Sequence, residues 1–194
     1  TTLMKFGLMF LTPLAVTSGV FAGTVSWLGG SGVWSDTAKW SGGALPATGD
    51  DGYVTNAVAG ETQILYEAPT VERLENLYLD SGGSGTLVVT QAQDRLEIQH
   101  QVWLGTTSGS TVKHVQTGGT NIFSVGYQGV FAVGFQTGST GVYHLVDGAL
   151  AANGDYGGQR SNVQLGPGGH GTFIQDGGVF QGSLCFGEHA LGLE

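Results

Sequence analysis

Gly141-Val142-Tyr143-His144-Leu145-Val146-Asp147-Gly148 is followed, 30 residues later, by a related segment, Gly171-Thr172-Phe173-Ile174-Gln175-Asp176-Gly177-Gly178. Two earlier segments, Gly85 to Thr90 and Val112 to Gly119, align with this pair. If Leu87, His114, Tyr143 and Phe173 are taken as equivalent positions, the copies are 27, 29 and 30 residues apart. A period of this length is typical of repeat proteins, in which each unit stacks on the next.

A second motif, apolar-x-apolar-Gly, alternates with the first. Its four copies end at Gly105, Gly134, Gly166 and Gly187, which are 29, 32 and 21 residues apart. Leu77-Tyr78-Leu79 looks like an earlier copy with Asp80 in place of the glycine. Two independent motifs that alternate in step indicate a repeat more strongly than either motif alone.

Both motifs are short runs with a period of two that end at glycine, which is the pattern of a strand closed by a turn. A unit of about 30 residues with short strands cannot bury a core by itself, whereas stacked copies bury a continuous one. The sequence therefore predicts an all-β fold, a parallel β-helix (β-solenoid). Leu104, Val133, Leu165 and Phe186 should form an interior column, with Trp103, Ala132, Gln164 and Cys185 facing outward. The closing glycines should have positive φ.

The buried face of the first motif is less clear from the pattern. One face holds the reference positions Leu87, His114, Tyr143 and Phe173, followed by Val89, Gln116, Leu145 and Gln175. The other holds Val88, Val115, His144 and Ile174. We favour the first face because its large side chains fill more volume. Gln116 and Gln175 would then need hydrogen-bond partners inside, such as a stacked ladder of amides.

Composition supports a folded protein and argues against nucleic acid as a partner. Glycine accounts for 36 of 194 residues, charged residues for 11% and hydrophobic residues for 40%, which is the opposite of a disordered chain. The net charge is −9, and the six basic residues are scattered rather than clustered. Cys185 is the only cysteine, so no internal disulfide can form.

The N-terminal residues have the three parts of a secretory signal peptide. Lys5 precedes an apolar run from Phe6 to Val20, and Val20-Phe21-Ala22 fits the small-x-small cleavage rule. We therefore expect a signal peptide over residues 1–22, cleavage between Ala22 and Gly23, and a secreted or cell-surface protein. Thr1 to Leu3 precede the expected start at Met4. The run is too short to span a membrane, and Pro13 interrupts it.

Residues 23–70 do not show the repeat and are expected to cap the N-terminal end of the solenoid, with the repeats over residues 71–194. Trp27, Trp34 and Trp40 fall within this segment, as do Asp50 and Asp51. A tryptophan-rich lid would cover the open end of the core. Alternatively, the same residues would form a sugar-binding platform. The paired carboxylates lack the spaced oxygen ligands of a calcium loop, so no metal or other cofactor is predicted.

The opening Trp-x-Gly-Gly-x-Gly-x-Trp-Ser-Asp-x-x-x-Trp from Trp27 to Trp40, followed by Gly49-Asp50-Asp51, resembles bacterial exported proteins with autotransporter-associated β-strand repeats. The units that begin at Gly141 and Gly171 look like the repeats of that family. The resemblance covers about residues 24–190. It implies a right-handed β-helix, a surface or secreted location and adhesion-type or matrix roles. No translocator barrel or sorting helix follows the repeats, so we expect the natural protein to be longer.

No catalytic motif stands out, and we expect a protein without enzymatic activity. The five histidines form no zinc-binding pair, because His114 and His144 should face opposite sides of the coil. The alternative is a carbohydrate-binding protein or a polysaccharide lyase or hydrolase, for which Asp147 and Asp176 on successive coils are the pair to inspect. Aspartate before glycine is also ordinary turn chemistry. Extracellular glycans or cell-surface and matrix components are the expected partners.

Overall fold

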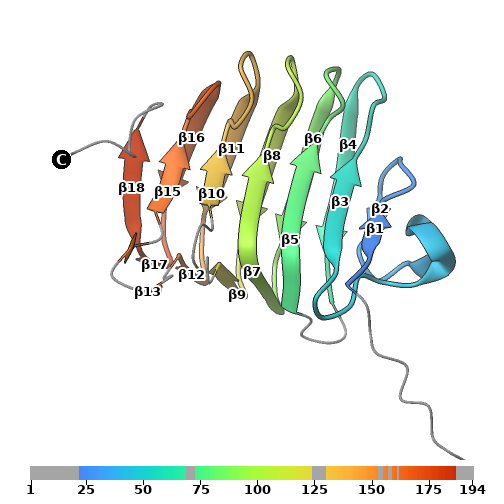
Figure 1. The fold of residues 1–194 in the computed structure, drawn as a ribbon, viewed down its shortest axis with the longest axis horizontal. Coiled ribbons are helices and arrows are strands. Elements are labelled where there is room, and N and C mark those ends of the chain that lie inside the picture. Colours follow the sequence, from blue (N-terminus) through green and yellow to red (C-terminus); the bar gives the residue numbers. More distant parts are fainter. Residues whose placement is uncertain are drawn as a thin grey trace, which may run out of the picture.

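The protein is a parallel β-solenoid, as the sequence predicted. The computed structural model describes residues 22–68, 73–123, 130–152, 155–156, 159–160 and 162–186. Its coils stack side by side from the N-terminal end at the right of Figure 1 to the C-terminal end at the left. Most of the predicted signal peptide lies outside the described residues, and so do Gly187 and His189.

Each coil contributes strands to two parallel ladders. The first ladder is formed by β1 (Thr24–Ser26), β3 (Asp51–Thr55), β5 (Arg73–Asp80), β7 (Arg95–Leu104), β10 (Val130–Val133), β15 (Asn162–Leu165) and β18 (Ser183–Phe186). The second is formed by β2 (Gly32–Val33), β4 (Glu61–Tyr66), β6 (Thr86–Gln91), β8 (Thr111–Gln116), β11 (Thr140–Leu145) and β16 (His170–Gln175).

A third, shorter ladder begins at β7, a strand that it shares with the first ladder. The first half of β7 pairs with β9 (Thr120–Phe123), which continues through β12 (Ala149–Ala151) to β17 (Val179–Gln181). The second half of β7 pairs with β10. Thus one long strand of the early coils is replaced by two short strands in the later ones. A separate antiparallel pair joins β13 (Asp155–Tyr156) to β14 (Gln159–Arg160).

The interior column predicted from the second motif is confirmed. Leu104 pairs in register with Val133, which pairs with Leu165, which in turn pairs with Phe186. The first three are buried, and Phe186 is exposed in the last described coil. Gly105, Gly134 and Gly166 have φ of 81°, 76° and 65°, so the predicted positive φ is also confirmed at these three corners.

The face chosen for the first motif is correct, but its alignment needs one correction. Val89, His114 and Tyr143 share one register position, whereas Leu87 pairs with Val112. The earliest copy is therefore displaced by two residues from the alignment predicted by sequence. Because side chains alternate with a period of two, this displacement changes the neighbours of Leu87 and leaves it on the buried face.

The ladders extend into the segment predicted as an N-terminal cap. β3 pairs in register with β5, and β4 pairs in register with β6. Coiling therefore begins before residue 71. The sequence pattern misses these coils because their closing turns use Asn56 and Glu67 rather than glycine. The part that covers the end of the core is the loop with two 3-10 turns, η1 (Thr37–Lys39) and η2 (Ser41–Gly43).

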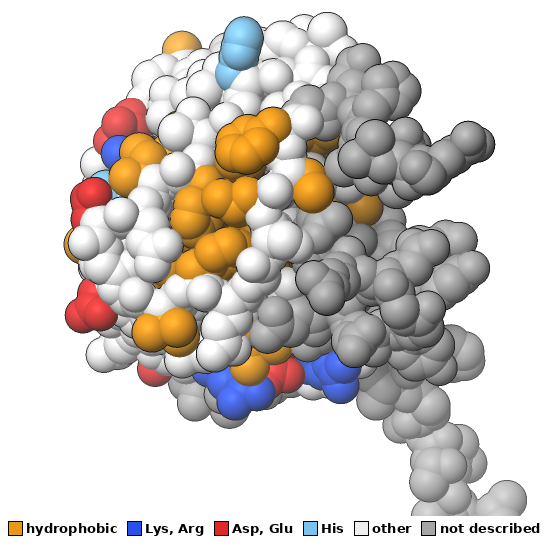
Figure 2. Space-filling model, turned by 90° about the vertical axis from the view of Figure 1, so that its left-hand side faces the viewer, with side chains coloured by type: hydrophobic (Ala, Val, Ile, Leu, Met, Phe, Trp, Pro, Cys, Tyr) orange, Lys and Arg blue, Asp and Glu red, His pale blue; other side chains and the backbone are white. Residues whose placement is uncertain are grey.

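The opposite end of the described solenoid leaves its interior in view. Figure 2 looks onto this end and shows a central group of apolar side chains, with backbone and other side chains around it. Phe173, Phe180 and Leu184 are only partly buried here, and Phe186 is 75% exposed. Interior positions that are covered in the preceding coils are thus uncovered in the last one.

Candidate functional surface

A file of aromatic side chains runs along the outside of the first ladder. Tyr53, Tyr78 and Trp103 occupy the same register position in β3, β5 and β7, and Phe135 follows β10. Tyr53 stacks on Tyr78 with ring centroids 4.3 Å apart, and Trp103 stacks on Phe135 with centroids 4.2 Å apart. Tyr78 meets Trp103 edge to face at 5.1 Å. All four side chains are partly exposed, although the indole nitrogen of Trp103 is buried.

A file of polar side chains lies beside the aromatic file, two residues earlier in each strand. It consists of Asp51, Asn76 and Gln101, which are in register. The Asn76 amide donates to Asp51 Oδ1 at 2.6 Å, and the Tyr78 hydroxyl donates to Gln101 Oε1 at 3.3 Å. Burial raises the pKa of Tyr78, and the neighbouring Tyr53 raises it further. The Tyr78 phenol therefore remains a hydrogen-bond donor at neutral pH.

The three tryptophans predicted as a cap or a sugar platform are core residues. Trp27, Trp34 and Trp40 are 4%, 4% and 0% exposed. The ring of Trp40 packs edge to face against Trp27 at 5.2 Å and against Trp34 at 4.7 Å. Its indole N–H donates to Trp34 O at 2.8 Å. Rings enclosed to this extent leave no free face on which a sugar can stack, and they close the N-terminal end of the core.

The two adjacent carboxylates, Asp50 and Asp51, point to different places. Asp50 is 8% exposed and accepts hydrogen bonds from the backbone N–H groups of Gly23 and Ala47. Asp51 belongs to the polar file beside Tyr53. Among the residues that the structure describes, no group of three or more His, Cys, Asp and Glu side chains is arranged to hold a metal ion.

The pair singled out for glycoside chemistry is engaged in other contacts. The Asp176 carboxylate lies 2.7 Å from His144 Nε2 on the outside of the second ladder. Asp147 accepts from the N–H of the following Gly148 at 2.7 Å, which is the turn role that aspartate before glycine commonly has. His114 and His144 do lie on opposite faces, because His114 is buried and His144 faces outward.

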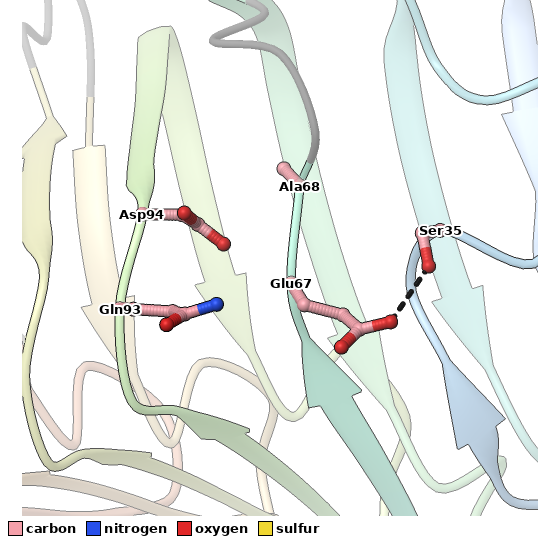
Figure 3. A pocket seen from close by; sticks show the side chains of 5 residues that line it. All are labelled: Ser35, Glu67, Ala68, Gln93 and Asp94. Carbon is pink, nitrogen blue, oxygen red and sulfur yellow. Dashed lines mark hydrogen bonds between the residues drawn. The ribbon is translucent and has the colours of Figure 1, made fainter.

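Sequence reasoning missed a surface pocket at the corner that follows β2, β4 and β6. Its volume is about 270 Å³, and it is lined by Ser35, Glu67, Ala68, Gln93 and Asp94 (Figure 3). Ser35 donates to Glu67 at 2.8 Å. Asp94 has a positive φ of 66°. The equivalent corner position in the next coil is Gly119. No motif pointed to this pocket, because its residues come from three coils with different spacings.

Sequence reasoning also missed a polar cluster inside the solenoid. Tyr143 donates to Gln116 Oε1 at 2.6 Å, and Asn121 donates to the Tyr143 hydroxyl at 2.7 Å. His114 stacks on the Tyr143 ring with centroids 4.8 Å apart. Gln116 uses its N–H groups for the backbone oxygens of Gly119 and Ala149, which replaces the amide ladder predicted for it. The cluster gives partners to the Tyr143 hydroxyl and the Gln116 amide, whereas the buried Asn121 Oδ1 has no hydrogen-bond partner.

No family model, curated protein or solved structure matches this chain. The described residues also contain no helix that is both long and apolar enough to cross a membrane. Function must therefore be inferred from the solenoid and its surfaces.

Proposed function

We propose that this protein is an exported, non-enzymatic structural component, adhesin-like in character, of the cell surface or extracellular matrix. The observation that carries the proposal is the in-register stacking of β3, β5, β7, β10, β15 and β18 over a continuous apolar interior. Such a stack is stiff because each coil pairs with its neighbours along the whole strand. The signal-peptide pattern of residues 1–22 and the resemblance to autotransporter-associated repeats support export.

The proposed mechanism is geometric. Coils stack about 4.8 Å apart, so each outward register position repeats along the rod at that spacing. The rod holds its surface groups in straight files without any need for conformational change. A partner with a repeating structure of its own can contact several coils at once, and weak contacts then add up.

One observation favours a second function, carbohydrate binding. The aromatic file of Tyr53, Tyr78, Trp103 and Phe135 lies beside hydrogen-bonding groups of Asp51, Asn76 and Gln101. Sugars are bound by this combination of apolar ring surface and precisely placed polar groups. With a net charge of −9, the protein favours an uncharged glycan over an acidic one.

A glycan array combined with a reducing-sugar assay separates these functions. A purely structural protein should show neither retention of a glycan nor release of reducing ends. If a neutral glycan binds, Tyr78→Ser should weaken binding at least about tenfold, because it removes one ring and one donor from the file. Val88→Ser, on the outward face of β6, is the matched control and should leave binding unchanged. Release of reducing ends by the wild-type chain would overturn the non-enzymatic proposal.

A further inference from the structure

The point where the chain enters the solenoid is fixed by the Asp50 carboxylate. The backbone N–H of Gly23 donates to Asp50 Oδ1 at 2.8 Å, and the N–H of Asp51 donates to Gly23 O at 2.8 Å. Gly23 is thereby held against the start of β3, immediately before β1. Ala22, the residue before it, is exposed.

Asp50 is placed by contacts that do not depend on Gly23. Its second oxygen accepts from Ala47 N–H at 2.9 Å, and its backbone oxygen accepts from Glu75 N–H at 2.9 Å. The residue is more than nine-tenths buried. A buried carboxylate with two neutral donors is stabilised further if one donor carries a positive charge.

We propose that Asp50 is the receptor for the α-ammonium group of a mature chain that begins at Gly23. This inference rests on the proposed export, since it requires cleavage of the signal peptide between Ala22 and Gly23. Hydrolysis of that peptide bond consumes one water, leaves Ala22 with a carboxylate and gives Gly23 a protonated amine. The nitrogen that now donates to Asp50 Oδ1 as an amide then becomes a cation at the same position.

Only a chain that begins at Gly23 places its positively charged N-terminal nitrogen beside the Asp50 carboxylate. A charge on Ala22 would stand in solvent, and a chain beginning at Thr24 would lack the nitrogen that meets Asp50. A Cβ at position 23 would lie 3.3 Å from Asp50 Oδ1, a tight contact that glycine avoids. Cleavage therefore converts the entry point of the chain into an ion pair that ties β1 to β3.

The first experiment exports the complete chain from a bacterial host and measures the intact mass and the N-terminal residues of the released product. We expect the product to begin at Gly23. A product that begins at another residue would overturn the pairing at Asp50. A chain that is retained in the cytoplasm uncleaved would overturn the proposed export as well, so the two failures are distinguishable.

The second experiment compares the mature chain beginning at Gly23 with the same chain beginning at Ala22, which keeps the Gly23 amide donor and moves the charge by one residue. The chain beginning at Gly23 should unfold at a temperature higher by about 5 °C. In the Asp50→Asn background this difference should shrink to about 1 °C or less. Equal unfolding temperatures of the two chains with Asp50 intact would overturn the ion pair, even if the Asn variant failed to fold.

Discussion

Gly134 shows how closely two turns of backbone approach one another at the corner after β10. Its φ is 76°, and a Cβ there would lie 2.3 Å from His170 O and 2.5 Å from His170 C. Backbone atoms cannot move away as a flexible side chain can. Both the conformation and the space at this corner therefore require glycine.

We expect Gly134→Val to lower the free energy of unfolding by about 3–5 kcal/mol, because the clash adds to the backbone strain. Gly42→Val is the matched control, since Gly42 has a φ of 79° but no atom within 4 Å of its hypothetical Cβ. Gly42→Val should lower the free energy of unfolding by only about 1–2 kcal/mol, because it introduces backbone strain without a clash. Urea denaturation measures both, and equal losses would contradict the role given to the close approach.

His114 makes stability depend on pH. Burial lowers its pKa from 6.5 to about 4, because the protonated ring loses its hydration inside the core. Between these two values the unfolded chain binds a proton that the folded chain does not bind. Above about pH 6.5 His114 does not reduce the free energy of unfolding. As the pH falls from 6.5 to 4 the free energy of unfolding decreases, and below pH 4 His114 causes no further decrease.

The expected loss between pH 7 and pH 4 from this residue is about 3 kcal/mol. His114→Phe keeps a ring stacked on Tyr143 and should remove that part of the pH dependence. His170→Gln, at an exposed position, should leave the pH dependence as it is in the wild type. Urea unfolding at pH 7, 5.5 and 4 measures the effect. Parallel pH curves for wild type and His114→Phe would rule it out.

Among the elements, the corner after β5 is closed by a carboxylate where later coils have glycine. Asp80 is fully buried. It follows Leu79, which pairs with Leu104, so Asp80 occupies the corner position that Gly105 has in the next coil. Its Oδ2 accepts from Thr106 Oγ1 and from Thr107 N–H, each at 2.7 Å, and also from Thr106 N–H. The side chain of one coil thus holds the turn of the next.

Asp80→Ala should destabilise the protein by about 2 kcal/mol, because it removes a buried carboxylate that accepts three hydrogen bonds from the next turn. Amide hydrogen exchange at Thr106 and Thr107 should accelerate along with the loss. Asp36→Ala, which removes an exposed carboxylate that accepts from Ala38 N–H, should cost about 1 kcal/mol. Unchanged exchange at Thr106 in Asp80→Ala would show that the carboxylate does not hold this turn.

The displaced first copy of the repeat has its explanation at this scale too. Sequence alignment compares residue types, and it placed Leu87 with His114. Strand pairing instead follows the turns between coils, which put Val89 beside His114. The number of residues in the intervening turns, rather than similarity of side chains, sets the register of stacked strands.

At the scale of the whole stack, the two ends of the described part of the solenoid differ in exposure. The tryptophan cluster buries the N-terminal end, whereas Phe186 and Val179 are 75% and 54% exposed in the last described coil. In a linear array each coil is stabilised by its neighbours, so a coil that is covered on one side opens more readily.

We therefore expect amide hydrogen exchange to be graded along the rod. Amides of β6 and β8 should be the slowest, and those of β16 and β18 should exchange at least about tenfold faster in native conditions. Exchange resolved by residue or by peptide measures the gradient. Uniform protection from β6 to β18 would mean that the solenoid opens as a single unit.

The sequence by itself determined the β-solenoid, the interior column from Leu104 to Phe186, the buried face of the first motif and the positive φ of Gly105, Gly134 and Gly166. These follow from local alternation and from glycine at corners, which a single coil already contains. Only the tertiary structure decided the register of the first copy, the early start of coiling, the burial of Trp27, Trp34 and Trp40, and the aromatic file. Those features lie mainly in the early coils, whose closing turns lack the glycines that mark the later copies and whose turn lengths set a register that similarity of residue types does not reveal.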